Sequence, residues 1–235
     1  MPTGVIVDSL AVLFGGLIGS LLSKRIKEEL KINLTLMFGL CAIAIGVKSI
    51  IVLVNLPVVI LSVIIGTAIG VSLKFEERVS KLLEVFEKHL KSFSNVDNQD
   101  EYISGLITVL VLFCASATGI FGSLDSGFSG DHTILFSKAI MDFFTAVIFA
   151  CNYGNVISLI SIPQFVVYLI IFLLARLIFP HTTDTMIADF KGCGGLLTLA
   201  TGYRVMKVKN FPVVDMIPSL LIVMPLSALW SIIMW

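Results

Sequence analysis

The sequence has few charged residues. Only 14% of its 235 residues are Asp, Glu, Lys or Arg, whereas soluble domains carry about 25%. Hydrophobic residues make up 57% of the chain, and its mean hydropathy is +1.03. This composition excludes a soluble globular domain and predicts an integral membrane protein in a lipid bilayer. The formal net charge of +0 leaves no basic surface for a nucleic-acid partner.

Motifs for common cofactors are also missing. The four cysteines stand singly, without the CxxC or Cys/His spacing of a zinc site or a redox pair. No segment matches GxxxxGK[ST], the loop that binds ATP phosphates. The segment 122–133 lacks the ligand spacing and the terminal Glu of an EF-hand. We therefore predict no metal, no cofactor and no catalytic residue, and we expect the chain not to be an enzyme.

Apolar segments of near-spanning length recur from end to end. A bilayer core is crossed by about 20 apolar residues in a helix. The chain is therefore predicted to be an all-α, polytopic transmembrane helix bundle of eight spans, forming a single integral membrane domain over 1–235. The first segment has no basic n-region and no small-x-small cleavage site, so we interpret it as a retained span. The spans are expected at 4–22, 33–54, 57–73, 103–121, 134–151, 156–179, 187–205 and 212–235.

The distribution of Lys and Arg predicts the orientation. The segments SKRIKEELK, 74–101 and YRVMKVKN are rich in Lys and Arg, whereas VNLP and 122–133 have none. Positively charged loops stay on the cytoplasmic side, so both termini are expected outside. The loop CNYGN carries no charge, which leaves seven spans as an alternative. Apolar residues at helical spacing in the linker 74–101 predict an amphipathic helix at the inner interface, with a soluble regulatory helix as the alternative.

Two parts of the chain resemble one another. The segments 38–61 and 194–216 share glycines in register, and NLPVV in the first matches NFPVV in the second. Spans one to three (about 1–73) would then correspond to spans six to eight (about 156–235), with 102–152 between them. A displacement of five spans inverts the second copy, and inverted repeats are typical of secondary transporters. Chance similarity of Gly- and Pro-containing apolar segments is the alternative. The equated positions are Gly39 with Gly195, Gly46 with Gly202, Lys48 with Arg204, and Asp8 with Gln164.

Small residues recur at four-residue spacing in two spans. Gly15 and Gly19 form a GxxxG pattern, and Ser62, Gly66 and Gly70 repeat it. Such faces let helix backbones approach closely in a membrane. They predict a compact bundle and, less specifically, a homodimer.

Ionisable residues within the spans are the candidate functional residues. Each costs about 2.5–3.5 kcal/mol at mid-bilayer, so it normally faces a partner, water or the bundle interior. Asp131, Lys138 and Asp142 fall on one helical face by their spacing. They predict the lining of a path for an ion or a small polar solute, and a buried Lys–Asp pair that joins two helices is the alternative. The predicted pathway residues are Asp8, Asp131, Lys138, Asp142 and Gln164, with Asp125, His132, Asp189 and Lys191 as secondary candidates.

The segment GSLDSGFSGDH precedes this face. Its glycines permit left-handed backbone and its Asp and Ser residues favour turns, so it is expected to be a tight outer connection. A re-entrant segment that lines a cavity is the alternative.

Three functions are compatible with these features. The first is secondary or channel-like transport of an ion or small polar solute. The second is a structural or scaffolding role in which the buried charges only pack helices. The third is an intramembrane enzyme acting on a lipid through Asp131 and His132, for which no nucleophile-and-base arrangement is evident.

Two segments also carry a family resemblance. FGSLDSGFSGDHTILFSKAIMD and MIADFKGCGGLLTLATGYRVMKVKNFPVVDMIPSLLI resemble the YqgA/YdfK-type family of bacterial inner-membrane proteins of unknown function (DUF554). The resemblance extends over essentially the whole chain. It implies a multi-pass protein of the bacterial plasma membrane, and it implies no substrate.

Overall fold

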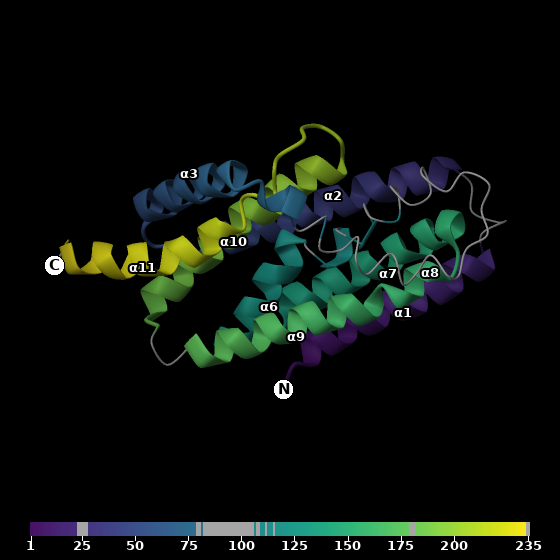
Figure 1. Ribbon diagram of the computed structural model, residues 1–235, viewed down its shortest axis with the longest axis horizontal. Helices are drawn as coiled ribbons and strands as arrows, with labels where there is room; N and C mark the ends of the chain where they lie inside the picture. The colour runs from purple at the N-terminus through teal and green to yellow at the C-terminus, as the bar shows by residue number, and fades with distance from the viewer. Residues whose placement is uncertain are drawn as a thin grey trace.

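The computed structural model describes residues 1–22, 28–78, 81, 106, 109–110, 112–114, 116–178 and 182–233. These residues form helices and connecting turns, without a strand among them (Figure 1). Most of the predicted amphipathic linker, 74–101, lies outside the described residues. The helices are α1 (Thr3–Leu22), α2 (Glu28–Ile50), α3 (Leu56–Ser72), α6 (Ala117–Ser129), α7 (Thr133–Tyr153), α8 (Val156–Leu159), α9 (Ser161–Ile178), α10 (Asp184–Val205) and α11 (Pro218–Ile233).

Several of these helices have the length and composition of membrane spans. Among the described residues, four segments qualify: Thr3–Leu22, Ile32–Ile50, Thr133–Tyr153 and Val156–Leu177. Helices α3 and α11 are apolar but shorter, with 17 and 16 residues. Large apolar side chains such as Ile140 (65% exposed) and Leu173 (54% exposed) cover the outside, as expected of a surface that faces lipid. The predicted all-α membrane bundle is confirmed, and the number of eight spans stays a prediction.

The segment 122–133 differs most from its predicted structure. Helix α6 continues through it to Ser129, and only residues 130–132 connect to α7. Gly130, with a φ of 72°, ends α6 in the left-handed conformation that glycine adopts easily. A Cβ on Gly127 would lie 2.7 Å from the carbonyl oxygen of Phe172 on α9. The prediction that the whole segment GSLDSGFSGDH forms a tight outer connection was therefore wrong, because some of its glycines serve close helix packing rather than turns.

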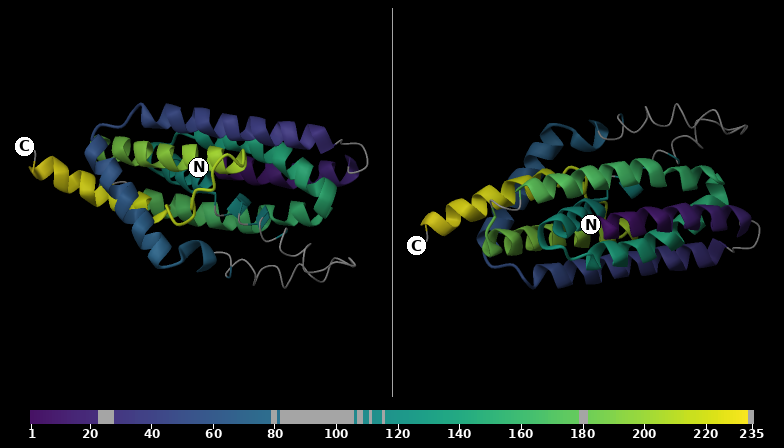
Figure 2. Two further views of the ribbon diagram at one scale, coloured as in Figure 1. Left: turned by 90° about the horizontal axis from the view of Figure 1, so that it is seen from above. Right: turned by 90° about the horizontal axis from the view of Figure 1, so that it is seen from below.

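Helices equated by the sequence similarity pack against each other in antiparallel pairs. Figure 2 shows α2 and α10 lying side by side along the length of the molecule. A Cβ on Gly46 would lie 2.7 Å from the carbonyl oxygen of Gly195, and a Cβ on Gly195 would lie 2.7 Å from that of Gly46. Gly39 and Gly202 approach in the same reciprocal way, with distances of 2.8 and 2.6 Å. The four equated glycines thus form the contact between α2 and α10.

The small-residue faces of α1 and α3 are used within the chain. Gly15 and Gly19 of α1 lie against the backbone of α7, and Gly66 and Gly70 of α3 lie against the backbone of α11 and the turn before it. The sequence predicted that these faces could form a homodimer, but they are covered by other parts of the same chain. A dimer would need another surface.

We expect Gly46→Leu to lower the free energy of unfolding by about 2 kcal/mol or more, because its side chain would enter the backbone of α10. Gly195→Leu should have a similar effect, since the contact is reciprocal. Thermal unfolding of the purified protein in lipid nanodiscs measures both. Leu40→Ala, at a position 54% exposed on the same helix, is the control and should change stability little. Equal stability of Gly46→Leu and the control would contradict the close contact.

Candidate functional site: a charged cluster beside a cavity

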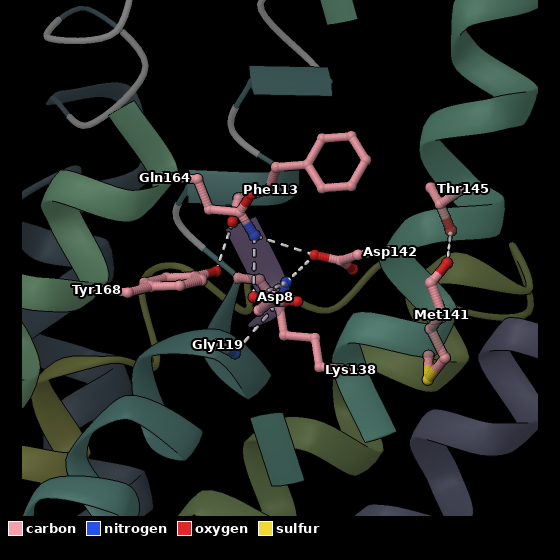
Figure 3. Close-up of polar contacts among 10 residues, drawn as sticks. Asp8, Phe113, Gly119, Lys138, Met141, Asp142, Thr145, Gln164 and Tyr168 are labelled. Carbon is pink, nitrogen blue, oxygen red and sulfur yellow. Dashed lines mark hydrogen bonds and ion pairs between the residues drawn. The ribbon is translucent and has the colours of Figure 1, made fainter. Parts of the chain in front are cut away.

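Four polar side chains meet in the interior of the bundle. Asp8 lies on α1, Lys138 and Asp142 lie one turn apart on α7, and Gln164 lies on α9 (Figure 3). Asp8 and Gln164 have no exposed surface, and the side chain of Asp142 is 13% exposed. We call these four residues the central cluster. All four are among the predicted pathway residues, and the fold brings them together.

Lys138 and Gln164 each contact both carboxylates. Lys138 Nζ donates to Asp8 Oδ2 at 3.3 Å and forms an ion pair with Asp142 Oδ2. Gln164 Nε2 donates to Asp8 Oδ2 at 3.0 Å and to Asp142 Oδ2 at 3.1 Å. The two carboxylates are therefore close neighbours that share both donors. Such pairing makes the burial of charge tolerable, because a lone buried charge is far more costly than a paired one.

Tyr168 closes one side of the central cluster. It lies four residues after Gln164, on the same face of α9, and it is fully buried. Its hydroxyl donates to the carbonyl oxygen of Phe113, and Lys138 Nζ lies 5.3 Å from its ring centroid, within the range of a cation–π contact. Sequence reasoning missed Tyr168, although its spacing from Gln164 is a signal that could have found it.

The helix before α6 ends beside the central cluster. Residues 112–114 are helical, Ser116 is extended with φ −64° and ψ 126°, and α6 begins at Ala117. Ser116 Oγ caps the new helix by accepting from Gly119 N at 3.4 Å. The fourth span was predicted over 103–121, and the structure interrupts the helix within that range at Ser116. Irregular backbone at membrane depth is tolerated where protein or a cavity surrounds it.

A cavity of about 120 Å³ adjoins the central cluster. Asp142 and Lys138 form part of its wall, with Ser116 and Thr118 near the start of α6. Further residues of α7, among them Thr145, and residues of α2 and α10 also line it, including Phe38, Ala42, Thr201 and Val205. The cavity is large enough for a few water molecules or a small solute. Asp142 is thus the carboxylate of the central cluster that faces this space.

A second cavity, of about 160 Å³, holds most of the remaining candidates. Lys191 Nζ pairs with Asp125 Oδ1 at 3.0 Å, and Lys48 and Asp131 share the cavity wall. Asp131 is exposed and lies before α7 begins, so it does not join Lys138 and Asp142 as predicted. Its carboxylate instead accepts from Thr133 N at 2.9 Å. This hydrogen bonding with Thr133, aided by the charges of Lys191 and Lys48, lowers the pKa of Asp131.

Asp189 serves to hold helices together. It is fully buried on α10, and its Oδ1 accepts from the backbone N–H groups of Val54 (3.0 Å) and Asn55 (2.7 Å). Its Oδ2 accepts from Asn55 Nδ2 at 2.9 Å and from Ser227 Oγ at 2.6 Å. The carboxylate therefore caps the start of α3 and ties it to α10 and α11.

His132 contacts Ser126 rather than the neighbouring Asp131. Its Nδ1 lies 2.5 Å from Ser126 Oγ, across the turn between α6 and α7. Within the described parts of the chain, no group of three or more His, Cys, Asp or Glu residues could hold a metal ion. The Asp131–His132 pair proposed for lipid chemistry is not formed, because the two side chains have different partners.

Sequence comparison places these features in a family. The profile of the family described as "Protein of unknown function (DUF554)" matches residues 3–228. The chain belongs to the DUF554 family.

This DUF554 protein is similar to proteins of two different bacteria. It is 42% identical over 231 residues to the "Uncharacterized protein YqgA" of Escherichia coli (strain K12), with 98% of each chain covered. It is 28% identical over 225 residues to the "Uncharacterized membrane protein YdfK" of Bacillus subtilis (strain 168), with 93% of each covered. No solved structure matches it. The family resemblance drawn from the residues is confirmed, and the membrane character of the DUF554 chain agrees with the name of YdfK.

Proposed function

We propose that this DUF554 protein is a secondary or passive transporter for an ion or a small polar solute in the bacterial plasma membrane. The observation that carries the proposal is the central cluster beside the cavity of about 120 Å³. Ionisable side chains at membrane depth normally mark an ion or substrate path. Asp142 and Lys138 would be the groups that contact the solute. This role is favoured over a purely structural one because Asp142 faces a cavity, whereas Asp189 makes four hydrogen bonds in a closed interior.

The positions of the two cavities support a path between α2 and α7. The cavity of about 160 Å³ touches residues 45–52, at the end of α2 and in the turn after it, and residues 133–137 near the start of α7. The other touches Phe38 and Ala42 of α2 and residues 138–149 of α7. About one helical turn separates the two along α2, from Ala42 to Ile45, and on α7 their linings adjoin at Ser137 and Lys138. Solute would pass from the cavity at Lys48 and Asp131 to the one at Asp142.

The packing of the equated helices supports an inverted repeat. When each glycine is replaced by the one equated with it, the Gly39–Gly202 contact becomes the Gly195–Gly46 contact. This is the pattern expected of two repeats related by a two-fold axis. Asp8 and Gln164, also equated, touch each other and would lie near that axis. Secondary transporters with inverted repeats place their sites at the repeat interface, beside interrupted helices. The helix interruption at Ser116 lies beside the central cluster in the same way.

The predicted orientation, with both termini outside, is also part of this proposal. Segments predicted to face outside gather at one end of the bundle. Gly4 lies against His132 in the α6–α7 turn, and Leu53 after α2 lies against Gly192 in the first half of α10. Ser227, near the C-terminus, joins them through Asp189. The cavity of about 160 Å³ would then open outward, and the one at Asp142 would be reached from the inside.

Filling the cavity beside Asp142 should stop transport without removing any charge. Wild-type protein is reconstituted into liposomes and screened for fluxes of protons, monovalent ions and divalent ions against protein-free liposomes. Thr145→Phe places a large side chain in the cavity, and we expect it to lower any flux at least about tenfold, an effect of about 1.4 kcal/mol on the barrier.

The matched control is Ile140→Phe, which enlarges a side chain 65% exposed on the same helix. It should transport like wild type. The proposal is wrong if no flux exceeds that of protein-free liposomes. The assigned path is wrong if Thr145→Phe and Ile140→Phe transport equally well.

A further inference from the structure

The central cluster carries unequal numbers of opposite charges. Asp8 and Asp142 supply two carboxylates, and Lys138 supplies the ammonium that contacts both. Among the described residues, the other side chains that contact these groups are Gln164 and Tyr168, and Cys114 lies near enough for the charges of Lys138 and Asp142 to act on it; all three are neutral in their ordinary forms. With both carboxylates ionised, the cluster would therefore hold one excess negative charge in the interior of the bundle.

The helices packed around Asp8 offer no second cation among the described residues. Helix α1 has no other ionisable residue, and α8 has none. On α6, Asp125 pairs with Lys191 in the other cavity. On α9, Arg176 lies over the ring of Phe172, three helical turns from Gln164 and thus about 18 Å away. The excess charge must be balanced at the cluster itself.

Two buried oxygen atoms in the cluster have no hydrogen-bond partner in the structure: Asp8 Oδ1 and Gln164 Oε1. Both residues are fully buried. An unpartnered carboxylate oxygen in such a place is unfavourable, because ionised groups lose their hydration on burial. A proton on Asp8 Oδ1 would neutralise the carboxylate and turn the unpartnered acceptor into a donor.

A proton fits this site better than a metal ion does. Hard cations such as Ca²⁺ take about six to eight oxygen ligands. The cluster offers two unpartnered oxygens, and the ammonium of Lys138 already contacts both Oδ2 atoms. A proton needs a single oxygen and no further space.

We propose that Asp8 binds one proton in the interior of the bundle and that this proton is the coupling ion of transport. The second half of this statement rests on the proposed function, whereas the first half does not. Asp142 faces the cavity, so it would exchange the proton with water or with the entering solute. Lys138 and Gln164 contact both carboxylates, so as the proton moves between Asp8 and Asp142 they would remain paired with whichever carboxylate is ionised.

Infrared spectroscopy of the purified protein in nanodiscs tests the proton site directly. A protonated carboxyl group has a carbonyl stretching band that a carboxylate lacks. We expect wild type to show this band at neutral pH and Asp8→Asn to lose it. Asp131→Asn is the control and should keep the band, because hydrogen bonding with Thr133 lowers the pKa of Asp131 and keeps it ionised.

If Asp8→Asn does not fold, Asp8→Glu replaces it, and the band should then shift in frequency. A band that is unchanged in the Asp8 variant, or no band in wild type, overturns the proposal. For the coupling half, a solute found in the flux screen should accumulate in wild-type liposomes along an imposed pH gradient. In Asp8→Asn liposomes it should only equilibrate, and accumulation there would overturn coupling through Asp8. If no solute moves in any sample, the proposed function fails while the infrared result still decides the proton site.

Discussion

Lys138→Met should lower the free energy of unfolding by about 3 kcal/mol or more, the largest stability effect we expect of any substitution in this protein. The ammonium of Lys138 contacts Asp8 and Asp142 in the interior of the bundle, and its own side chain is 3% exposed. Methionine keeps most of the volume but leaves Asp142 ionised without a cation. The expected measurement is a strongly reduced thermal stability in nanodiscs, together with a lower yield of folded protein.

A double-mutant cycle separates charge from packing. With a neutral Asp8, only Asp142 needs the charge of Lys138, so Lys138→Met combined with Asp142→Asn should recover most of the lost stability. Replacement of a complete buried ion pair by neutral groups is often close to neutral, whereas removal of one partner is not. If the double variant is as unstable as Lys138→Met alone, packing of the lysine stem, and not charge, explains the loss.

Asp142→Asn should abolish transport while leaving the fold in place. Asparagine retains the shape and an oxygen that can accept from Gln164 Nε2, but it removes the charge that faces the cavity. We expect any flux found in the liposome screen to fall at least about a hundredfold, because a solute or proton loses its charged partner, an effect of about 2.7 kcal/mol. The thermal stability of Asp142→Asn, measured in the same preparation, should stay well above that of Lys138→Met, because Asp8 contacts Lys138 at 3.3 Å and can release its proton to balance that charge.

Asp131→Asn is the matched control for this prediction. Asp131 lies on the wall of the other cavity, is exposed, and has Thr133 as its hydrogen-bond partner. Its replacement should reduce flux only a fewfold, through weaker attraction of charged solutes to the opening. Equal losses in both variants would mean that the central cluster has no special part in transport.

The sequence by itself determined the class of protein and many of its important residues. Low charge and long apolar segments are sufficient to predict a helical membrane protein, because the bilayer requires apolar helices of a certain length. Asp8, Lys138 and Asp142 stood out for the same reason, since each is costly in an apolar segment. The spacing of Lys138 and Asp142 on α7 and the correspondence of Asp8 with Gln164 were also visible in the sequence.

Only the tertiary structure decided which of these residues meet. Asp8 reaches α7 because glycines let α1 and α7 approach closely, which sets their rotation and their offset along the bundle, and packing of α9 on α1 brings Gln164 to Asp8. Close packing against α9 keeps α6 helical through a segment whose glycines, by local sequence alone, predict a turn. Asp131 lines another cavity than predicted, because α7 begins only after it. Contacts of this kind join residues far apart in the chain, and local sequence patterns do not specify helix rotation or axial offset.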